Sequence, residues 1–188
     1  ETMPQYAHLP LLLKPDGNGK LSKRDGDRLG FPVFPLNWTD PQTGEVSAGY
    51  RERGYYPEAF VNMLALLGWN PGTEQELFSM EELIAAFSFE HVHKAGARFD
   101  PEKAKWFNEQ YLRKQPDVQL AARLKEKVLK EFNYAAGDRR VSDAFLIHVV
   151  QLLKDRVQFE NEIIEKGRYL FETPATYDQP VIDKKWKP

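Results

Sequence analysis

Two lysines and a serine stand close together near the start of the chain, at Lys20, Ser22 and Lys23. They follow the segment Pro15-Asp16-Gly17-Asn18-Gly19, whose residue types are typical of turns. Lysine binds phosphate oxygens as a point charge, and a serine hydroxyl can donate a hydrogen bond to the same group. This spacing, on a backbone made mobile by glycine, therefore predicts a loop that binds a polyphosphate and then releases it.

Other sites built on similar residues do not fit. Leu21 stands where a P-loop has Ser or Thr after its Gly-Lys pair. A calcium loop that began at Asp16 would have Lys20 among its ligands, and no glutamate follows at the required distance. We expect no metal site, and we interpret His91 and His93 as residues of a helix end or turn.

The composition is that of an ordinary globular protein, with 41% hydrophobic and 29% charged residues among 188. No apolar run is long enough to span a bilayer, and no secretory signal is seen, so no membrane partner is expected. The absence of cysteine excludes disulfides and thiolate zinc sites and fits a cytoplasmic protein. Neither a Ser-His-Asp constellation nor a catalytic carboxylate pair stands out.

Positive charge gathers in the middle of the chain. Residues 94–140 hold 12 Lys and Arg against 7 Asp and Glu, although the whole chain has a net charge of −2. Within this region, the helix expected over 103–114 mixes basic and aromatic side chains. Such a mixture suits an RNA backbone, but it also fits an amphipathic helix with core aromatics and solvated lysines.

Helical patterns dominate from Pro57 onward. Pro57 suits a first helical position, and Gly68 suits the end of that helix. Ser79 and Glu82 form a capping box that opens a second helix, with Leu83, Ile84 and Phe87 predicted to face inward. A third helix is expected from Asp100-Pro101 to about Lys114, a fourth on the stripe Leu120, Leu124 and Val128, and a fifth from Ser142 through Leu146, Val149, Val150, Leu153 and Val157.

Before Pro57 the chain predicts little regular structure. Tyr6 to Leu13 is a strand-like run. Residues 25–56 are rich in Gly, Pro and aromatic residues, which predicts an ordered irregular insert with a small hairpin around Pro41-Gln42-Thr43-Gly44. The predicted fold class is therefore mainly α, with a short β and loop segment at the start.

Tyr6-Ala7-His8-Leu9-Pro10-Leu11-Leu12-Leu13, followed by the Asp16-Gly17 turn and Lys20-Leu21-Ser22-Lys23-Arg24, resembles the second signature of class I aminoacyl-tRNA synthetases. It resembles the KMSKS loop in the form that glutamyl-tRNA synthetases use. Further similar segments follow in collinear order over nearly the whole chain: Gly54 to Ala59, Asn62 to Trp69, Phe99-Asp100, Phe107-Asn108, Tyr111 to Arg113, Leu152 to Val157 and Tyr169 to Phe171. The helices favour the bacterial type of this family.

This resemblance implies an enzyme that activates glutamate with ATP and transfers it to the 3′ end of tRNA(Glu). Lys20 and Lys23 are then the expected catalytic residues. Leu21, Ser22 and Lys23 are the expected ATP-binding residues. ATP, with Mg²⁺, is implied as a substrate of the full enzyme and not as a group bound stably by this segment. The partners implied are tRNA(Glu), glutamate and ATP, and no DNA.

The resemblance also implies a division of the chain. Residues 1–56 would end the catalytic domain, 57–115 would form the stem-contact helical domain, and 116–188 would begin the helical anticodon-binding domain. The resemblance further implies that the basic helix over 103–114 contacts tRNA. The candidate contacts are Lys103, Lys105, Asn108 and Arg113.

Two departures from the family pattern matter. The first signature, the HIGH motif, is expected to lie N-terminal to Glu1, so we expect a C-terminal fragment that is inactive alone. Residues 29–49 are longer than the usual link after the loop, and their role is open. The alternative is a non-catalytic, synthetase-like module that binds tRNA; a paralogue that charges tRNA-derived nucleosides fits less well, because of the helical tail.

Overall fold

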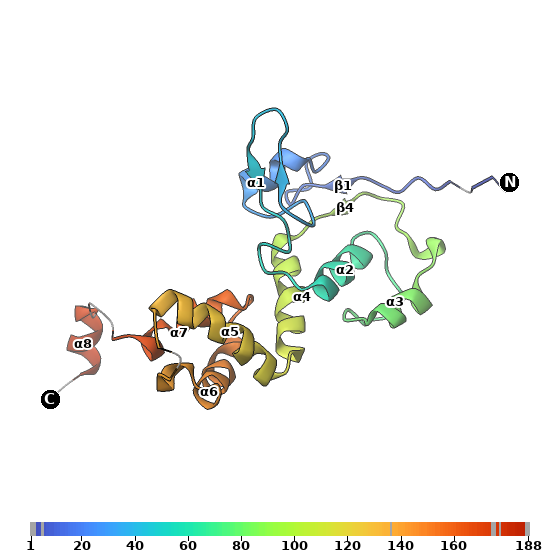
Figure 1. The fold of residues 1–188 in the computed structure, drawn as a ribbon. Coiled ribbons are helices and arrows are strands. Elements are labelled where there is room, and N and C mark those ends of the chain that lie inside the picture. Colours follow the sequence, from blue (N-terminus) through green and yellow to red (C-terminus); the bar gives the residue numbers. More distant parts are fainter. Residues whose placement is uncertain (1–2, 5, 136, 174–175, 177, 187–188) are drawn as a thin grey trace. The chain divides into compact units, whose positions relative to one another are not determined.

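The computed structural model describes residues 3–4, 6–135, 137–173, 176 and 178–186, so Glu1 lies outside the described residues. The chain divides into two compact units, 1–114 and 115–188. Most of the regular structure is helical, as the sequence predicted (Figure 1). The three-part division at 56/57 and 115/116 stays a prediction.

The first unit begins with short strands. β1 (Leu12–Leu13) pairs in parallel with β4 (Ala97–Arg98), so that the start of the chain lies beside a segment some 85 positions later (Figure 1). Only these two residues of the predicted run from Tyr6 form a strand. β2 (Trp38–Thr39) and β3 (Val46–Ser47) form an antiparallel hairpin, which confirms the hairpin predicted around Pro41.

α1 (Lys23–Leu29) corrects the prediction of an irregular segment from residue 25 onward. The longer helices of this unit lie close to the predicted positions: α2 (Pro57–Leu66), α3 (Met80–Ala86) and α4 (Pro101–Lys114). The short 3₁₀ helix η1 (Phe89–His91) was not predicted. Pro57 occupies the first turn of α2, and the chain leaves that helix through Gly68 at φ +97°. The capping box of Ser79 and Glu82 is present.

Two apolar clusters hold the first unit together. α2 packs on α4, with Ala59 and Met63 buried on one helix and Phe107 and Tyr111 on the other. Leu83 of α3 joins a second cluster with Trp69 and Phe78. The prediction that Ile84 and Phe87 also face inward is wrong, because their side chains are 72% and 47% exposed.

The second unit is a set of packed helices. α5 (Asp117–Phe132) packs on α6 (Asp143–Leu153) and α7 (Asn161–Phe171). The short 3₁₀ helices η2 (Arg139–Val141) and η3 (Lys154–Arg156) flank α6, and α8 (Gln179–Lys185) follows. The predicted stripes are confirmed as core: Leu120, Leu124, Val128, Leu146, Val149, Val150, Leu153 and Val157 are all buried. α7 and α8 were not predicted.

Candidate functional site

The segment that carries Lys20 is a closed turn. The Lys14 N–H donates to the Gly19 carbonyl at 3.1 Å, and the Leu21 N–H donates to the Leu12 carbonyl at 2.8 Å. Lys20 therefore returns beside the end of β1, where it forms an antiparallel bridge with Leu13. The turn presents the Lys20 side chain at the surface.

Ser22 ends the turn and starts α1. Its hydroxyl donates to Asp25 Oδ2 at 2.6 Å, and its N–H donates to the same oxygen at 2.9 Å. A carboxylate three residues into a helix that accepts from the N-cap residue is one half of a capping box. Lys23 is consequently the first residue of α1 instead of a residue of an irregular loop.

Asp25 is the buried anion under this site. The hydrogen bonds from Ser22 lower the pKa of Asp25 to about 2, and the nearby cations Arg28 and Lys14 act in the same direction. Arg28 Nη2 lies 2.8 Å and Lys14 Nζ 3.7 Å from Asp25 Oδ1. The cations that pair with Asp25 are thus Lys14 and Arg28 and not the lysines of the predicted phosphate site. Among the described residues, neither the Lys20 nor the Lys23 ammonium group has a hydrogen bond or an ion pair.

The Lys23 ammonium instead lies against two aromatic rings. Its Nζ is 5.4 Å from the centroid of Phe34 and 5.5 Å from that of Trp38, within the range of a cation–π contact. The two rings are stacked, with centroids 4.9 Å apart and planes 14° apart. Both belong to the segment 29–49, whose role the sequence left open.

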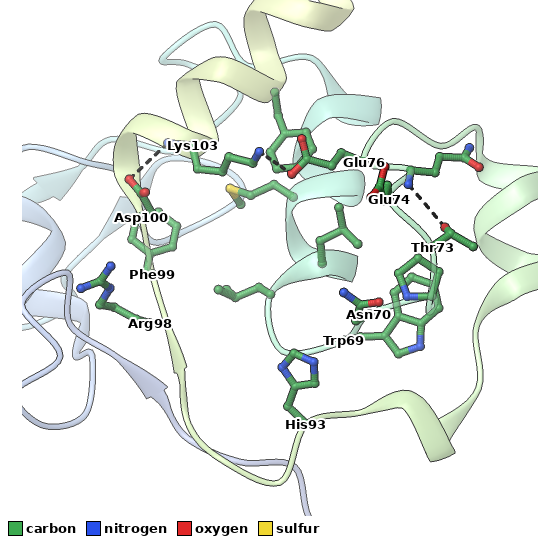
Figure 2. A pocket seen from close by; sticks show the side chains of 16 residues that line it. Trp69, Asn70, Thr73, Glu74, Glu76, His93, Arg98, Phe99, Asp100 and Lys103 are labelled. Atoms are coloured by element: carbon green, nitrogen blue, oxygen red, sulfur yellow. Dashed lines mark hydrogen bonds and ion pairs between the residues drawn. The ribbon is translucent and has the colours of Figure 1, made fainter.

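The predicted RNA-facing helix is α4, and its three candidate cations each have an acidic partner. Lys103 Nζ lies 2.6 Å from Glu76 Oε1, as Figure 2 shows, and 3.9 Å from the Trp106 ring centroid. Lys105 pairs with Glu102 at 2.7 Å, and Arg113 pairs with Glu109 at 2.5 Å. All three pairs are partly exposed, so that a phosphate could compete for each cation.

Asn108 has a different position from the one predicted. Its side chain is fully buried, with Oδ1 accepting from the Tyr56 N–H at 2.8 Å and Nδ2 donating to the Gly54 carbonyl at 3.4 Å. A buried amide presents no atom to an RNA. The prediction of Asn108 as a tRNA contact is therefore corrected: the residue holds the start of α2 against α4.

A cavity of about 420 Å³ opens beside Lys103 (Figure 2). Trp69, Phe99 and Phe107 are among its apolar lining residues, and charged groups of both signs also line it. His93, which follows the bridge residue Val92, also lines the cavity, whereas His91 ends η1, which agrees with the interpretation of that histidine as a residue of a helix end. In the part of the chain that the structure describes, no cluster of three or more His, Asp or Glu could hold a metal ion.

Sequence reasoning missed three residues that shape the lysine site. Asp25 carried a usable signal, since Ser22-x-x-Asp25 has the spacing of a capping box with Asp in place of Glu. Phe34 and Trp38 carried no comparable signal, because the tertiary fold brings them to Lys23 and no local spacing does.

Comparison with known families decides the affiliation. The family described as tRNA synthetases class I (E and Q), catalytic domain, matches residues 1–106. The chain belongs to this family. The resemblance seen in the sequence is thereby confirmed, and the lysines of the turn lie within the matched region.

The relatives of this family member are glutamate–tRNA ligases. Those of Phocaeicola vulgatus and Porphyromonas gingivalis are 56% and 54% identical over 187 residues, which is 100% of this chain and 36% of each relative. A crystal structure of a glutamate tRNA ligase from Elizabethkingia meningosepticum, in complex with its amino acid, matches with a TM-score of 0.87 and 49% identity, covering 99% of this chain and 36% of that one. The chain thus spans about a third of the length of the relatives it matches. None of the helices described is long and apolar enough to cross a membrane.

Proposed function

We propose that this chain is part of a glutamate–tRNA ligase, which activates glutamate with ATP and transfers it to the 3′ end of tRNA(Glu). The observation that carries the proposal is the identity of 54–56% to ligases of this name over the whole chain. The remaining two thirds of such a ligase would supply the first signature and the glutamate site. We accordingly expect no activation by residues 1–188 alone.

The proposed reaction develops negative charge on phosphate oxygens, which the ammonium groups of Lys20 and Lys23 can stabilise. In the activation step the glutamate carboxylate attacks the α-phosphorus of ATP, and pyrophosphate leaves. Negative charge grows on the phosphate oxygens, and fixed cations stabilise it more in the transition state than in the ground state. Lys23 is the main candidate for this role and Lys20 the second. Mg²⁺ would arrive with ATP as part of the substrate.

Ser22 and Leu21 have proposed roles that differ from those of the lysines. The Ser22 hydroxyl already donates its hydrogen bond to the Asp25 carboxylate, so Ser22 supports the site mainly by starting α1 at Lys23. Leu21 remains the candidate for a backbone contact to adenine. Its N–H is already bonded to Leu12, which leaves its carbonyl as the group available.

The tRNA would contact the helical parts of the chain. Lys103, Lys105 and Arg113 of α4 are the candidates for phosphate contacts, as part of a stem-contact domain over 57–115. Residues 116–188 would begin the anticodon-binding domain. Phosphate contacts would supply most of the affinity and make it dependent on salt. We place the reaction in the cytoplasm, together with its tRNA.

The experiment that tests the proposal uses the full-length ligase that contains this chain, with pyrophosphate exchange measured in the presence of tRNA(Glu). We expect Lys23→Ala to lower glutamate activation by at least about 100-fold, the loss typical of removing a group that stabilises transition-state charge. Binding of tRNA(Glu) should not change. Lys94→Ala removes an exposed lysine of the same unit and is the matched control.

Two results would contradict the proposal at different points. Near-normal activation by the Lys23→Ala enzyme would remove Lys23 from the phosphate site. Absence of activation by the unsubstituted full-length protein, with tRNA binding retained, would favour the non-catalytic tRNA-binding module.

A further inference from the structure

The aromatic segment 29–49 is attached to α1 through several independent contacts. The Ser47 hydroxyl of β3 donates to Asp27 Oδ2 of α1 at 2.7 Å. A Cβ atom at Gly26 of α1 would lie 2.2 Å from Val33 Cγ2, so only glycine permits this approach. The segment and the helix that begins at Lys23 therefore form one packed body.

The backbone on either side of the two rings is also held in place. The Tyr50 N–H donates to the Phe34 carbonyl at 2.9 Å. The Gly49 N–H donates to Asn37 Oδ1 at 2.8 Å, and the Asn37 N–H donates to Glu52 Oε2 at 2.9 Å. Phe34 and Trp38 are consequently half-buried, stacked rings on a fixed frame and not loose surface aromatics.

We propose that Phe34 and Trp38 are positioning residues for Lys23, which hold its ammonium at the start of α1 ready for the phosphates of ATP. The inference rests on the proposed function, in which Lys23 binds those phosphates. It gives the segment 29–49 a role in glutamate activation, because two aromatic residues of this segment position the Lys23 side chain.

The physical argument is one of preorganisation. A free lysine side chain has many rotamers, and ordering them costs free energy each time a phosphate binds. The stacked pair of rings lies within cation–π distance of the ammonium and restricts these rotamers beforehand. An ammonium group has three N–H donors, and none of them has to bond to a ring, so they can donate to phosphate oxygens. Binding and positioning are therefore compatible.

The test is a double-mutant cycle in the full-length ligase, again by pyrophosphate exchange. Trp38→Leu should lower kcat/KM for ATP about two- to fivefold, the factor expected for one partly exposed cation–π contact. Trp38→Phe keeps a ring and should retain most of the activity. In the Lys23→Ala background, Trp38→Leu should have no further effect, because the ammonium that the rings hold is gone. The affinity for tRNA and the KM for glutamate should not change.

Val46→Thr is the matched control within the same hairpin. Val46 pairs with Thr39, while Trp38 pairs with Ser47, so the exposed Val46 lies on the opposite face of the hairpin from Trp38. This variant should activate glutamate normally. Should Trp38→Leu fold poorly, Phe34→Leu serves as the second ring variant and should give the same pattern.

The outcomes separate this inference from the function on which it rests. Unchanged activity of both ring variants, or an equal loss in the presence and absence of the Lys23 side chain, overturns the positioning role only. Normal activation by Lys23→Ala overturns the positioning role together with the assignment of Lys23.

Discussion

Ser22 and Asp25 bind each other twice, through the Ser22 hydroxyl at 2.6 Å and its N–H at 2.9 Å, both to Asp25 Oδ2. This pair converts a turn rich in glycine into the start of a helix whose first residue is Lys23. It also means that the proposed phosphate-binding lysine depends on a carboxylate that carries no expected role in the chemistry. The stability of the site is therefore linked to the ionisation of Asp25.

Acid should weaken this part of the structure. The hydrogen bonds from Ser22 lower the pKa of Asp25 from 3.8 to about 2, so folding stabilises the charged form. Its contribution is complete above pH 3.8 and is lost as the pH falls to about 2. We expect Asp25→Asn to be less stable than the unsubstituted chain at pH 6, and the difference to shrink between pH 4 and pH 2. Urea unfolding followed by tryptophan fluorescence measures this.

Asp138→Asn is the control for this experiment. Hydrogen bonds from Arg140 lower the pKa of Asp138 to about 2 as well, but Asp138 lies in the second unit. The Asp138→Asn variant should change the pH dependence of unfolding of the second unit and leave that of the first unit unchanged. An Asp25→Asn chain with the same pH dependence as the unsubstituted one would show that the capping carboxylate does not control the site.

Gly49 tests how rigid the aromatic segment is. A Cβ atom at this position would lie 2.1 Å from the Leu36 carbonyl carbon and 2.5 Å from the Asn37 nitrogen, both backbone atoms that cannot rotate away. Gly49→Ala should therefore lower the free energy of unfolding by about 1–3 kcal/mol, as overpacking does elsewhere. Gly137→Ala, with nothing within 4 Å of the added carbon, should be nearly neutral. Equal stability of the two variants would mean that the backbone of the segment shifts to accommodate the added carbon at little cost in free energy.

Asn62 is the polar centre of the first unit. It is fully buried, and its side chain accepts from the Phe78 N–H at 2.8 Å and donates to the Glu76 carbonyl at 2.9 Å. The Tyr111 hydroxyl lies 2.7 Å from the same Oδ1 atom. Asn62→Ala removes the acceptor of the Phe78 N–H and the donor to the Glu76 carbonyl, at a cost of about 1–3 kcal/mol for a buried group, whereas the Tyr111 hydroxyl keeps its bond to the Phe78 carbonyl at 2.7 Å. Thermal unfolding should show a loss of several kcal/mol.

The exposed Asn70 provides the comparison for Asn62. Its single side-chain bond, from the Gly72 N–H, lies at the surface, where water can replace it. Asn70→Ala should therefore cost much less than Asn62→Ala. A similar cost for the two variants would argue against a structural role for the buried amide.

Local signals predicted the helices well where capping and periodicity agree. Ser79 and Asp100 open helices, and the stripe Leu120, Leu124 and Val128 is buried as expected. α7 was not predicted, because Gly167 interrupts its apolar face. Its glycine is explained only by the tertiary structure, where a Cβ atom would lie 2.7 Å from Leu153 of α6. Periodicity alone could not have shown that contact.

The same limit explains the errors at the candidate sites. Ile84 has helical spacing, but the seven-residue α3 packs its Leu83 and Ala86 on the cluster of Trp69 and Phe78, and Ile84 stays exposed. Asn108 stands near lysines in the sequence. In the structure, however, its side-chain oxygen accepts a hydrogen bond from the Tyr56 N–H, a backbone donor at the start of α2. Lys23 was identified from its neighbours in the chain, whereas the rings near its ammonium come from Trp38 of the following hairpin and from Phe34, which precedes that hairpin.

The acidic partner of Lys103 offers a direct test of the proposed RNA contact. Glu76→Gln removes the carboxylate 2.6 Å from the ammonium, which frees Lys103 for a phosphate. If Lys103 meets tRNA, this change should raise the affinity for tRNA(Glu) and steepen the slope of log K against log salt by up to about one unit. Lys103→Gln should flatten the slope by a similar amount, and joint neutralisation of Lys103, Lys105 and Arg113 by up to about three units. Glu90→Gln makes the same charge change on η1 and should leave the slope unaltered; equal slopes in all these variants would return α4 to the role of a solvated helix face.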